Sequence, residues 1–391
     1  MVGMAIAHQL LEKTPSLSIT IIDKEPEVGK HGSGRNSGVL HAGLYYEPGS
    51  VKAQVCVDGA RRLRAWCEEE KLPVLICGKV VTPQKASLDG QLEVLVERGT
   101  KNGATVEHID EQQFRSLVPE GYTSTGRAIW SPNTCVVKPA LVMQRLEQRL
   151  KDKGVDFIYG TSLMKALPQS QTIVLTGGKE VSYGHLFNCA GLHSDKVAQQ
   201  FGAGLDYTML PFRGSYWQLK KDAPFTFTTN LYPVPDLEVP FLGVHATPSV
   251  DGTVYFGPSA TPAMGRENYY GLQKVDPLGT INFMRHITTQ FFVDKKIRKY
   301  VREQAFAWMP HKFLEAAQTI VPTLKMEHVE RSRKVGIRPQ LYHKQNRVLV
   351  QDFLMEEGPS STHVLNAISP AFTASFALAD YILAKSSIKN S

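Results

Sequence analysis

The chain has 391 residues, more than one hydrophobic core usually supports, so its length favours two domains. Its 42% hydrophobic and 21% charged residues are typical of a globular protein and argue against disorder. The 44 Lys and Arg exceed the 37 Asp and Glu, but the excess is scattered, and even the densest basic patch, 295–299, is interrupted. This pattern argues against a nucleic-acid-binding protein and leaves open an anionic substrate or an anionic membrane surface.

The five cysteines form no CxxC pair and have no histidine at metal-ligand spacing, so we expect neither a metal site nor a disulfide framework. A reducing compartment fits this usage best. No apolar stretch reaches the ~18 to 20 residues that a membrane-spanning helix needs, so we expect at most peripheral membrane association. We also expect no import signal here, because folded sequence begins at the first residues.

The start of the chain has the pattern of half a nucleotide-binding unit. Residues 1–13 predict a helix with an apolar stripe, and the β-branched run 17–23 predicts a buried parallel strand. The acidic residue that closes such a strand binds a ribose, which makes Asp23 the candidate and Glu25 its competitor. Gly3 would be the third glycine of G-x-G-x-x-G, so we expect the first strand and the first two glycines to precede the first residue.

The later elements predict an α/β fold in which a Rossmann-like domain holds an inserted antiparallel-sheet domain. Helices are expected over 139–153, within 272–318 and over 371–385, and strands over 155–159, 172–175, 186–191 and 347–350, with antiparallel sheet in 208–259. The nucleotide-binding domain is assigned to 1–80, 139–206 and 331–391, and the substrate domain to 81–138 and 207–330.

The most informative segment is 30–46, KHGSGRNSGVLHAGLYY. Its glycines let the backbone approach a ligand, and its Ser, Asn and His side chains supply hydrogen bonds. It resembles the D-amino-acid-oxidase-like FAD superfamily. In the form H-x-x-G-x-N-S-G-V-x-H-A-G-x-Y-Y-x-P-G-S it is similar to the L-2-hydroxyglutarate dehydrogenase family in particular. An ordinary Gly/Ser loop ahead of a helix is the alternative, but seventeen residues in this order argue against it.

Five other segments resemble the same family in the same order: 188–195, 211–214, 240–245, 336–340 and 366–375. The resemblance implies FAD as the cofactor. Small residues opening the last helix would present backbone N–H groups to the flavin's pyrimidine edge. The implied cofactor-binding residues are Gly3, Asp23, Arg35, Asn36, Ser37, Gly38, Gly191, Ser369, Ala371 and Thr373.

Oxidation of a 2-hydroxy acid moves a hydride from C2 to the flavin while a base takes the hydroxyl proton. Histidine is the simplest base near neutral pH. His245 and His41 lie in the glycine-flanked segments expected near the flavin, although a structural role is equally open for each. His31 and His193 are interpreted as cofactor-loop or structural residues, and Cys189 as a packed thiol.

Planar arginine side chains are the expected partners of substrate carboxylates. Arg338, next to Pro339 on an expected rigid turn, and Arg213, in Pro-Phe-Arg-Gly, are the candidates. Two such groups would suit the two carboxylates of a small dicarboxylic 2-hydroxy acid.

The resemblance therefore implies FAD-dependent oxidation of L-2-hydroxyglutarate to 2-oxoglutarate, with electrons passed to a quinone-type acceptor. It also implies a mitochondrial, membrane-associated enzyme in eukaryotes. Two alternatives stay open. One is another flavoprotein of the superfamily, acting on glycerol 3-phosphate or an amino acid, and the other is an inactive flavoprotein-like binding module.

Overall fold

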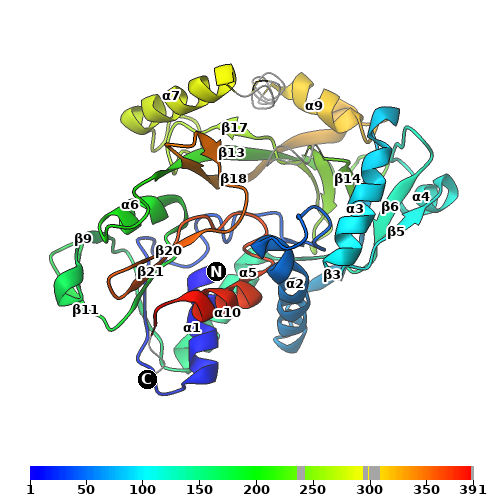
Figure 1. Cartoon of the computed structure of the whole chain (residues 1–391). Coiled ribbons are helices and arrows are strands. Elements are labelled where there is room, and N and C mark those ends of the chain that lie inside the picture. The colour runs from blue at the N-terminus through cyan, green and yellow to red at the C-terminus, as the bar shows by residue number, and fades with distance from the viewer. Residues whose placement is uncertain (236–242, 294–297, 299–308, 389–391) are drawn as a thin grey trace.

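The computed structural model describes residues 1–235, 243–293, 298 and 309–388. Figure 1 shows α7 (Pro277–Val293) and α9 (Pro310–Gln318) on one side of a long strand pair. On the other side lie α1 (Val2–Lys13), α2 (Val51–Glu69) and α10 (Ser375–Lys385). The mixed α/β class predicted from the sequence is confirmed. Segment 240–242 and most of the basic patch 295–299 lie outside the described residues.

The helical layer is held together by apolar residues at helical spacing. Met4, Ala7 and Leu11 of α1 are buried in one core cluster with residues of α5 (Pro139–Asp152) and α10. In α2, a Cβ at Gly59 would lie 2.5 Å from the Cα of Ala374. This close approach explains a glycine in the middle of a long helix.

Short strands join distant parts of the chain in this layer. β1 (Thr20–Ile22) pairs in parallel with β8 (Asp156–Ile158), and β12 (Leu186–Asn188) pairs in parallel with β21 (Ser361–Val364), which also pairs with β20 (Met355–Gly358). The expected assembly of one layer from the start, middle and end of the chain is therefore present. Two small antiparallel sheets add β9 (Leu163–Leu167), β10 (Thr172–Leu175) and β11 (Glu180–Ser182), and β2 (Val39–Leu40), β3 (Val74–Ile76) and β7 (Cys135–Val137).

A ten-stranded sheet is the second layer of the described chain, in the order β19-β18-β13-β16-β15-β14-β4-β6-β5, with β17 beside β13. Its pairings are antiparallel except for β14 with β4. α3 (Gly90–Lys101), α4 (Glu111–Leu117) and α6 (Ser194–Gln199) complete the described helices. The strands are β4 (Lys79–Thr82), β5 (Glu107–Ile109), β6 (Ala128–Ser131), β13 (Tyr207–Leu219), β14 (Asn230–Pro233), β15 (His245–Pro248), β16 (Val254–Gly257), β17 (Thr261–Pro262), β18 (Val329–His343) and β19 (Val348–Leu349).

The two faces of this sheet have different surroundings. On the outer face, Trp217 of β13 and Phe256 of β16 are paired and pack into the apolar cluster beneath α9, where Trp217 stacks on Phe313. Side chains alternate along a strand, so Tyr216 and Tyr255 lie on the opposite face, which we call the inner face. The same alternation determines which predicted site residues can meet.

Three expectations differ from the structure. The run 17–23 forms only the short strand β1, and its side chains are exposed or half-buried rather than buried, because β8 is the only strand that pairs with it among the described residues. The last helix begins at Ser375, since residues 369–374 form turns instead. Arg338 lies within β18 and not on a turn, because the backbone on both sides of it pairs with β13. The domain boundaries stay a prediction, and β18 crosses the one at 330/331.

Candidate active site

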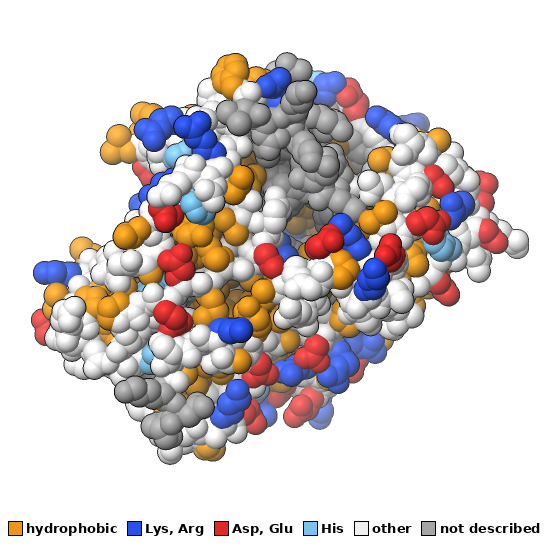
Figure 2. All heavy atoms as spheres, viewed as in Figure 1, with side chains coloured by type: hydrophobic (Ala, Val, Ile, Leu, Met, Phe, Trp, Pro, Cys, Tyr) orange, Lys and Arg blue, Asp and Glu red, His pale blue; other side chains and the backbone are white. Residues whose placement is uncertain are grey.

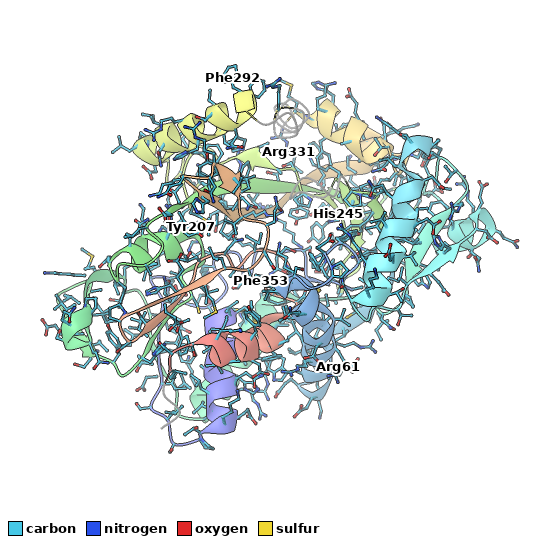
Figure 3. All side chains as sticks on the ribbon, in the orientation of Figure 1. Arg61, Tyr207, His245, Phe292, Arg331 and Phe353 are labelled. Atoms are coloured by element: carbon cyan, nitrogen blue, oxygen red, sulfur yellow. The ribbon has the colours of Figure 1, made fainter. Side chains whose placement is uncertain are left out.

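His245 opens β15 on the inner face of the sheet. Its Nδ1 lies 3.0 Å from the carbonyl oxygen of Gly243, and its ring stacks on Tyr232 with centroids 3.9 Å apart. A carbonyl oxygen can only accept, so Nδ1 carries the proton and Nε2 keeps its lone pair. Burial lowers the pKa of His245 to about 3, which keeps the ring neutral near pH 7. Figure 3 places His245 in the centre of the molecule, between the sheet and α2.

His41 reaches the same region from the other layer. Its Nδ1 is buried without a hydrogen-bond partner among the described residues, and its Nε2 lies 3.4 Å from the Oγ of Ser369. Burial holds the pKa of His41 well below its usual value, and the neighbouring Lys79 and His245 lower it further. The structure therefore brings the two predicted histidines together as neutral rings.

Lys79 begins β4 on the inner face, and the sequence offered no reason to select it. The register of the pairs aligns Lys79 with Asn230, and therefore with Tyr232 two residues on, while Val80 points to the outer face. The side chain is fully buried, and its Nζ has no hydrogen-bond partner among the described residues. Its nearest aromatic neighbours are the rings of Tyr232, 4.6 Å away, and Tyr45, 5.2 Å away. A buried ammonium group with such surroundings is suited to bind an anion.

Arg338 and Arg213 are not brought together. Arg338 pairs with Phe212 across the two strands, and it interacts electrostatically with Tyr46 and Lys52 of the other layer, so its guanidinium is on the inner side. Arg213 is one position further along β13 and points to the other face. There burial lowers its pKa, and its Nε finds no hydrogen-bond partner among the described residues. The two predicted carboxylate-binding arginines therefore cannot hold the two ends of one small ligand on one face.

A second lysine accompanies Arg338 at its end of the site. Lys52, in the first turn of α2, is 8% exposed, and burial together with the charge of Arg338 lowers its pKa to about 7. Arg338 also interacts electrostatically with the half-buried Tyr46, which is hydrogen-bonded to Ser369. The Ser369 hydroxyl thus links the surroundings of Arg338 to His41.

The predicted cofactor loop orders itself through its own polar groups. The Asn36 amide donates to the carbonyl oxygens of Gly32 and Ser33, and its oxygen accepts from the amide of Gly38. The Ser37 hydroxyl accepts from the Val39 amide at 3.3 Å. These bonds hold the glycine-rich backbone in one conformation.

Arg35 fastens this loop to the other layer. Its guanidinium lies 4.2 Å from the centre of the Tyr269 ring and donates to the carbonyl oxygen of Val335 at 3.3 Å. Ser37 contributes through its carbonyl oxygen, which accepts from Lys334.

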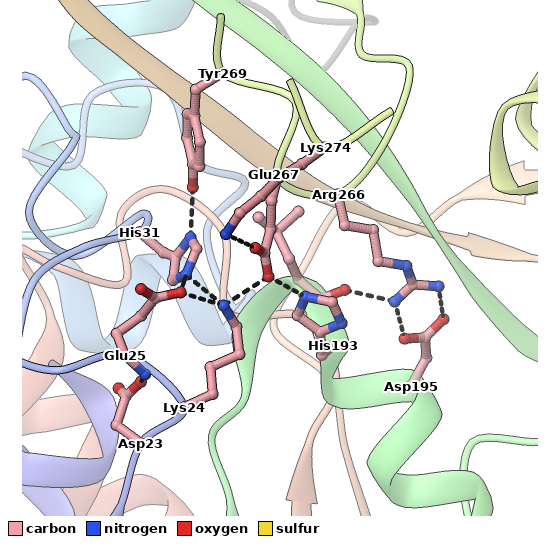
Figure 4. Close-up of polar contacts among 11 residues, drawn as sticks. Asp23, Lys24, Glu25, His31, His193, Asp195, Arg266, Glu267, Tyr269 and Lys274 are labelled. Atoms are coloured by element: carbon pink, nitrogen blue, oxygen red, sulfur yellow. Dashed lines mark hydrogen bonds and ion pairs between the residues drawn. The ribbon is translucent and has the colours of Figure 1, made fainter. Parts of the chain in front are cut away.

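A charged network at the end of β1 joins the same two layers (Figure 4). Lys24 forms ion pairs with Glu25 and Glu267, and His31 contacts both Glu25 and Tyr269. Glu267 also pairs with His193 and Lys274, and Asp195 pairs with Arg266. His31 and His193 thus have structural partners.

The predicted ribose ligand Asp23 lies beside this network. Its carboxylate accepts from the Glu25 amide, while the Glu25 side chain is engaged by Lys24 and His31. This favours Asp23 over Glu25 for ribose binding. Glu25, His31 and Glu267 could each offer a ligand atom within 4.8 Å of the others, but Lys24 forms ion pairs with both carboxylates and Lys274 forms a second one with Glu267.

The turn before α10 fixes the segment that carries His41. The Thr373 hydroxyl donates to the carbonyl oxygen of Val39 and accepts from the His41 amide. The Ala371 amide donates to the carbonyl oxygen of Ile368, so it is already engaged within the turn. Thr373 is therefore a positioning residue for His41 in this structure.

The loops leave room for a dinucleotide. Gly3 lies in the first turn of α1 against Cys189, whose thiol is packed and has its pKa raised to about 12 by burial. Gly191 adopts φ +53°, and a Cβ there or at Gly32 would meet no atom within 4 Å. Together with the unsatisfied Nδ1 of His41, this space and these donors fit an FAD molecule lying between the two layers.

This arrangement defines a class of protein: a two-layer flavoprotein oxidoreductase whose substrate sheet faces a dinucleotide-binding layer. The family model described as "FAD dependent oxidoreductase" (DAO) matches residues 1–385. The chain therefore belongs to the FAD-dependent oxidoreductase family, and the predicted cofactor and enzyme class are confirmed.

Three relatives that are 32% to 34% identical to this chain share one name. The chain is 34% identical to the L-2-hydroxyglutarate dehydrogenase of Indibacter alkaliphilus, and the match covers 96% of this chain and 94% of the relative. It also matches two proteins named mitochondrial L-2-hydroxyglutarate dehydrogenase. The one from Caenorhabditis elegans is 34% identical, with 97% and 90% covered, and the one from Homo sapiens is 32% identical, with 97% and 85% covered. The predicted family resemblance is confirmed. Bacterial relatives lack the mitochondrial designation.

Solved structures support the fold alone. The FAD-bound L-alpha-glycerophosphate oxidase of Mycoplasma pneumoniae superposes with a TM-score of 0.74 at 18% identity, covering 98% of this chain and 91% of that one. The glycine oxidase of Geobacillus kaustophilus superposes with a TM-score of 0.71 at 16% identity, covering 100% and 94%.

Proposed function

We propose that this protein oxidises L-2-hydroxyglutarate to 2-oxoglutarate with FAD as its electron acceptor. The observation that supports this most is the pair of neutral histidines, His245 and His41, with the cationic Arg338 connected to His41 through Tyr46 and Ser369. A base and a carboxylate partner on one surface are what oxidation of a 2-hydroxy acid needs. The names of the relatives agree with this substrate.

We assign the following roles to residues of the chain. FAD, when bound, supplies the acceptor for the hydride from C2. Arg338, with Lys52 beside it, holds the carboxylate next to C2, and the Nε2 of His245 takes the C2 hydroxyl proton. The hydrogen bond from Nδ1 to Gly243 keeps the ring in the tautomer that can accept this proton. His41, tied to Thr373 and Ser369, lines the opposite side.

The substrate is tested by anaerobic mixing of the FAD-loaded protein with candidate reductants while flavin absorbance is followed. L-2-hydroxyglutarate is expected to bleach the flavin faster than its D enantiomer, L-lactate, glycerol 3-phosphate or amino acids. With the carboxylates fixed, the D enantiomer presents the wrong atom to the flavin, and L-lactate lacks the distal carboxylate. Faster bleaching by any other compound contradicts the proposal. Bleaching by glycerol 3-phosphate alone would assign the protein to the alternative substrate class.

We further propose a quinone-type electron acceptor and peripheral membrane association, with a mitochondrial location in a eukaryotic cell. No helix in the described ranges is long and apolar enough to cross a bilayer. On α7, however, Leu278, Ile281 and Phe292 are 80%, 66% and 71% exposed. In Figure 2, orange side chains lie next to blue ones at the edge of the molecule that α7 forms. Exposed apolar residues beside basic ones are typical of a surface that rests on anionic lipid.

Membrane association is tested by flotation of the protein with vesicles that contain anionic lipid. Binding is expected to weaken with salt and in the Leu278→Ser/Ile281→Ser double variant, because both charge and apolar contact would contribute. A matched pair of exposed residues away from α7, Ile76 and Met164, serves as the control. Equal flotation of both double variants contradicts the proposal.

A further inference from the structure

The inner face carries a cation that the proposed chemistry at C2 does not use. Lys79 is fully buried, and its Nζ has no hydrogen-bond partner among the described residues. Arg213, which could have bound a second carboxylate, points to the other face of the sheet. The dicarboxylic substrate of the proposed function therefore still needs a cation for its distal end.

The surroundings of Lys79 leave its charge unneutralised. The interacting groups beside it are the thiols of Cys56 and Cys77, whose pKa values burial raises to about 12 and about 11. The rings of Tyr45 and Tyr232 attract the ammonium without neutralising it, and burial raises the pKa of both phenols. A buried ammonium with no anionic partner is costly, so a bound carboxylate would be strongly favoured there.

The position of Lys79 is also suitable. Lys79 and Arg338 lie on different strands, β4 and β18, yet both interact with the same short stretch of the other layer: Lys79 with Tyr45 and Cys56, and Arg338 with Tyr46 and Lys52. His41 lies between them, because it interacts electrostatically with Lys79 and is joined through Ser369 to the surroundings of Arg338. A ligand with an anion at each end and a hydroxyl near one end would match this order.

We propose that Lys79 binds the carboxylate farther from the hydroxyl and so makes the enzyme selective for dicarboxylic 2-hydroxy acids. This inference rests on the proposed function. Arg338 holds the carboxylate next to C2, and Lys79 holds the other through a charge-assisted hydrogen bond between its ammonium and a carboxylate oxygen. The neighbouring tyrosine rings exclude water and strengthen that bond.

The experiment compares L-2-hydroxyglutarate with L-2-hydroxypentanoate, which has the same chain length and no distal carboxylate. In the FAD-loaded protein, Lys79→Met is expected to lower kcat/KM for the dicarboxylate about 10- to 100-fold, the loss typical of a hydrogen bond to a charged group. The value for the monocarboxylate should stay the same or rise. Lys79→Arg keeps a cation and should retain most of the preference.

Lys334→Met is the matched control. Lys334 is another buried lysine of the sheet whose pKa burial lowers to about 8, but its Nζ already donates to the carbonyl oxygen of Ser37. Loss of the Lys334 ammonium should change kcat/KM for both substrates by the same factor. If Lys79→Met also changes kcat/KM for both substrates by one factor, or lowers only FAD occupancy, the inference is wrong. If the wild-type protein does not reduce its flavin with L-2-hydroxyglutarate at all, the proposed function itself has failed.

The pH dependence of substrate selectivity gives a second test, because a lysine with only a structural role would not affect it. Burial lowers the pKa of Lys79 to about 8, so its positive charge is present below that pH and is lost above it. The cysteines, tyrosines and histidines that face it are uncharged at this pH. The selectivity of the wild-type protein for the dicarboxylate should therefore fall as pH rises through about 8, and that of Lys79→Arg should not. If selectivity depends on pH in the same way in the wild-type protein and in Lys79→Arg, the assignment is wrong.

Discussion

Replacing His245 with Gln is expected to slow flavin reduction by L-2-hydroxyglutarate about 10²- to 10⁴-fold, the range typical for loss of a general base. A neutral amide of similar size can keep the contact with Gly243 but cannot take the hydroxyl proton. Single-turnover stopped-flow reduction of the FAD-loaded variant measures this step separately from product release. Melting temperature and FAD content, measured on the same sample, show whether the fold is intact.

His41→Gln is the control for this assignment, because both neutral histidines face the same region. The rate of flavin reduction should fall less in this variant, since the Nε2 of His41 already faces Ser369. A larger loss in His41→Gln than in His245→Gln would assign the base to His41. The pH dependence gives a second check: because the pKa of His245 is about 3, kcat/KM should stay flat from about pH 6 down to about pH 5, below the pKa of about 7 of Lys52.

Replacing Arg338 with Lys is expected to lower kcat/KM for L-2-hydroxyglutarate by roughly 10²- to 10³-fold, which corresponds to about 3 to 4 kcal/mol. Lysine keeps the charge but loses the planar fork that holds a carboxylate through two hydrogen bonds. Steady-state kinetics with both substrates of the Lys79 experiment should show a loss for each, because each has the carboxylate next to C2.

Arg213→Lys is the matched control, since Arg213 sits on the neighbouring strand but on the other face. It should leave kcat/KM within a few fold. Unaltered kinetics in Arg338→Lys would exclude its role, and a large loss in Arg213→Lys would show that the face assignment from the strand register is wrong.

The sequence alone predicted much of the local structure, because this information is contained in short segments. The apolar stripe of residues 1–13 and the amphipathic run 139–153 became α1 and α5, and the glycine-rich segment 30–46 identified the family. The same local signals failed at boundaries. Thus 17–23 became the three-residue strand β1, and Arg338, expected on a turn because proline and glycine lie nearby, was incorporated into β18.

Which side chains share a surface was decided by the tertiary structure. Arg213 and Arg338 looked equivalent in the sequence, yet the register between β13 and β18 places them on opposite faces. Lys79 had no distinguishing motif, and its burial beside Tyr232 follows from the pairing of β4 with a strand some 150 positions later. Strand register and layer packing depend on contacts between distant residues. The sequence could therefore determine the family, the cofactor and the histidine candidates, while only the folded chain could show which cations face the substrate.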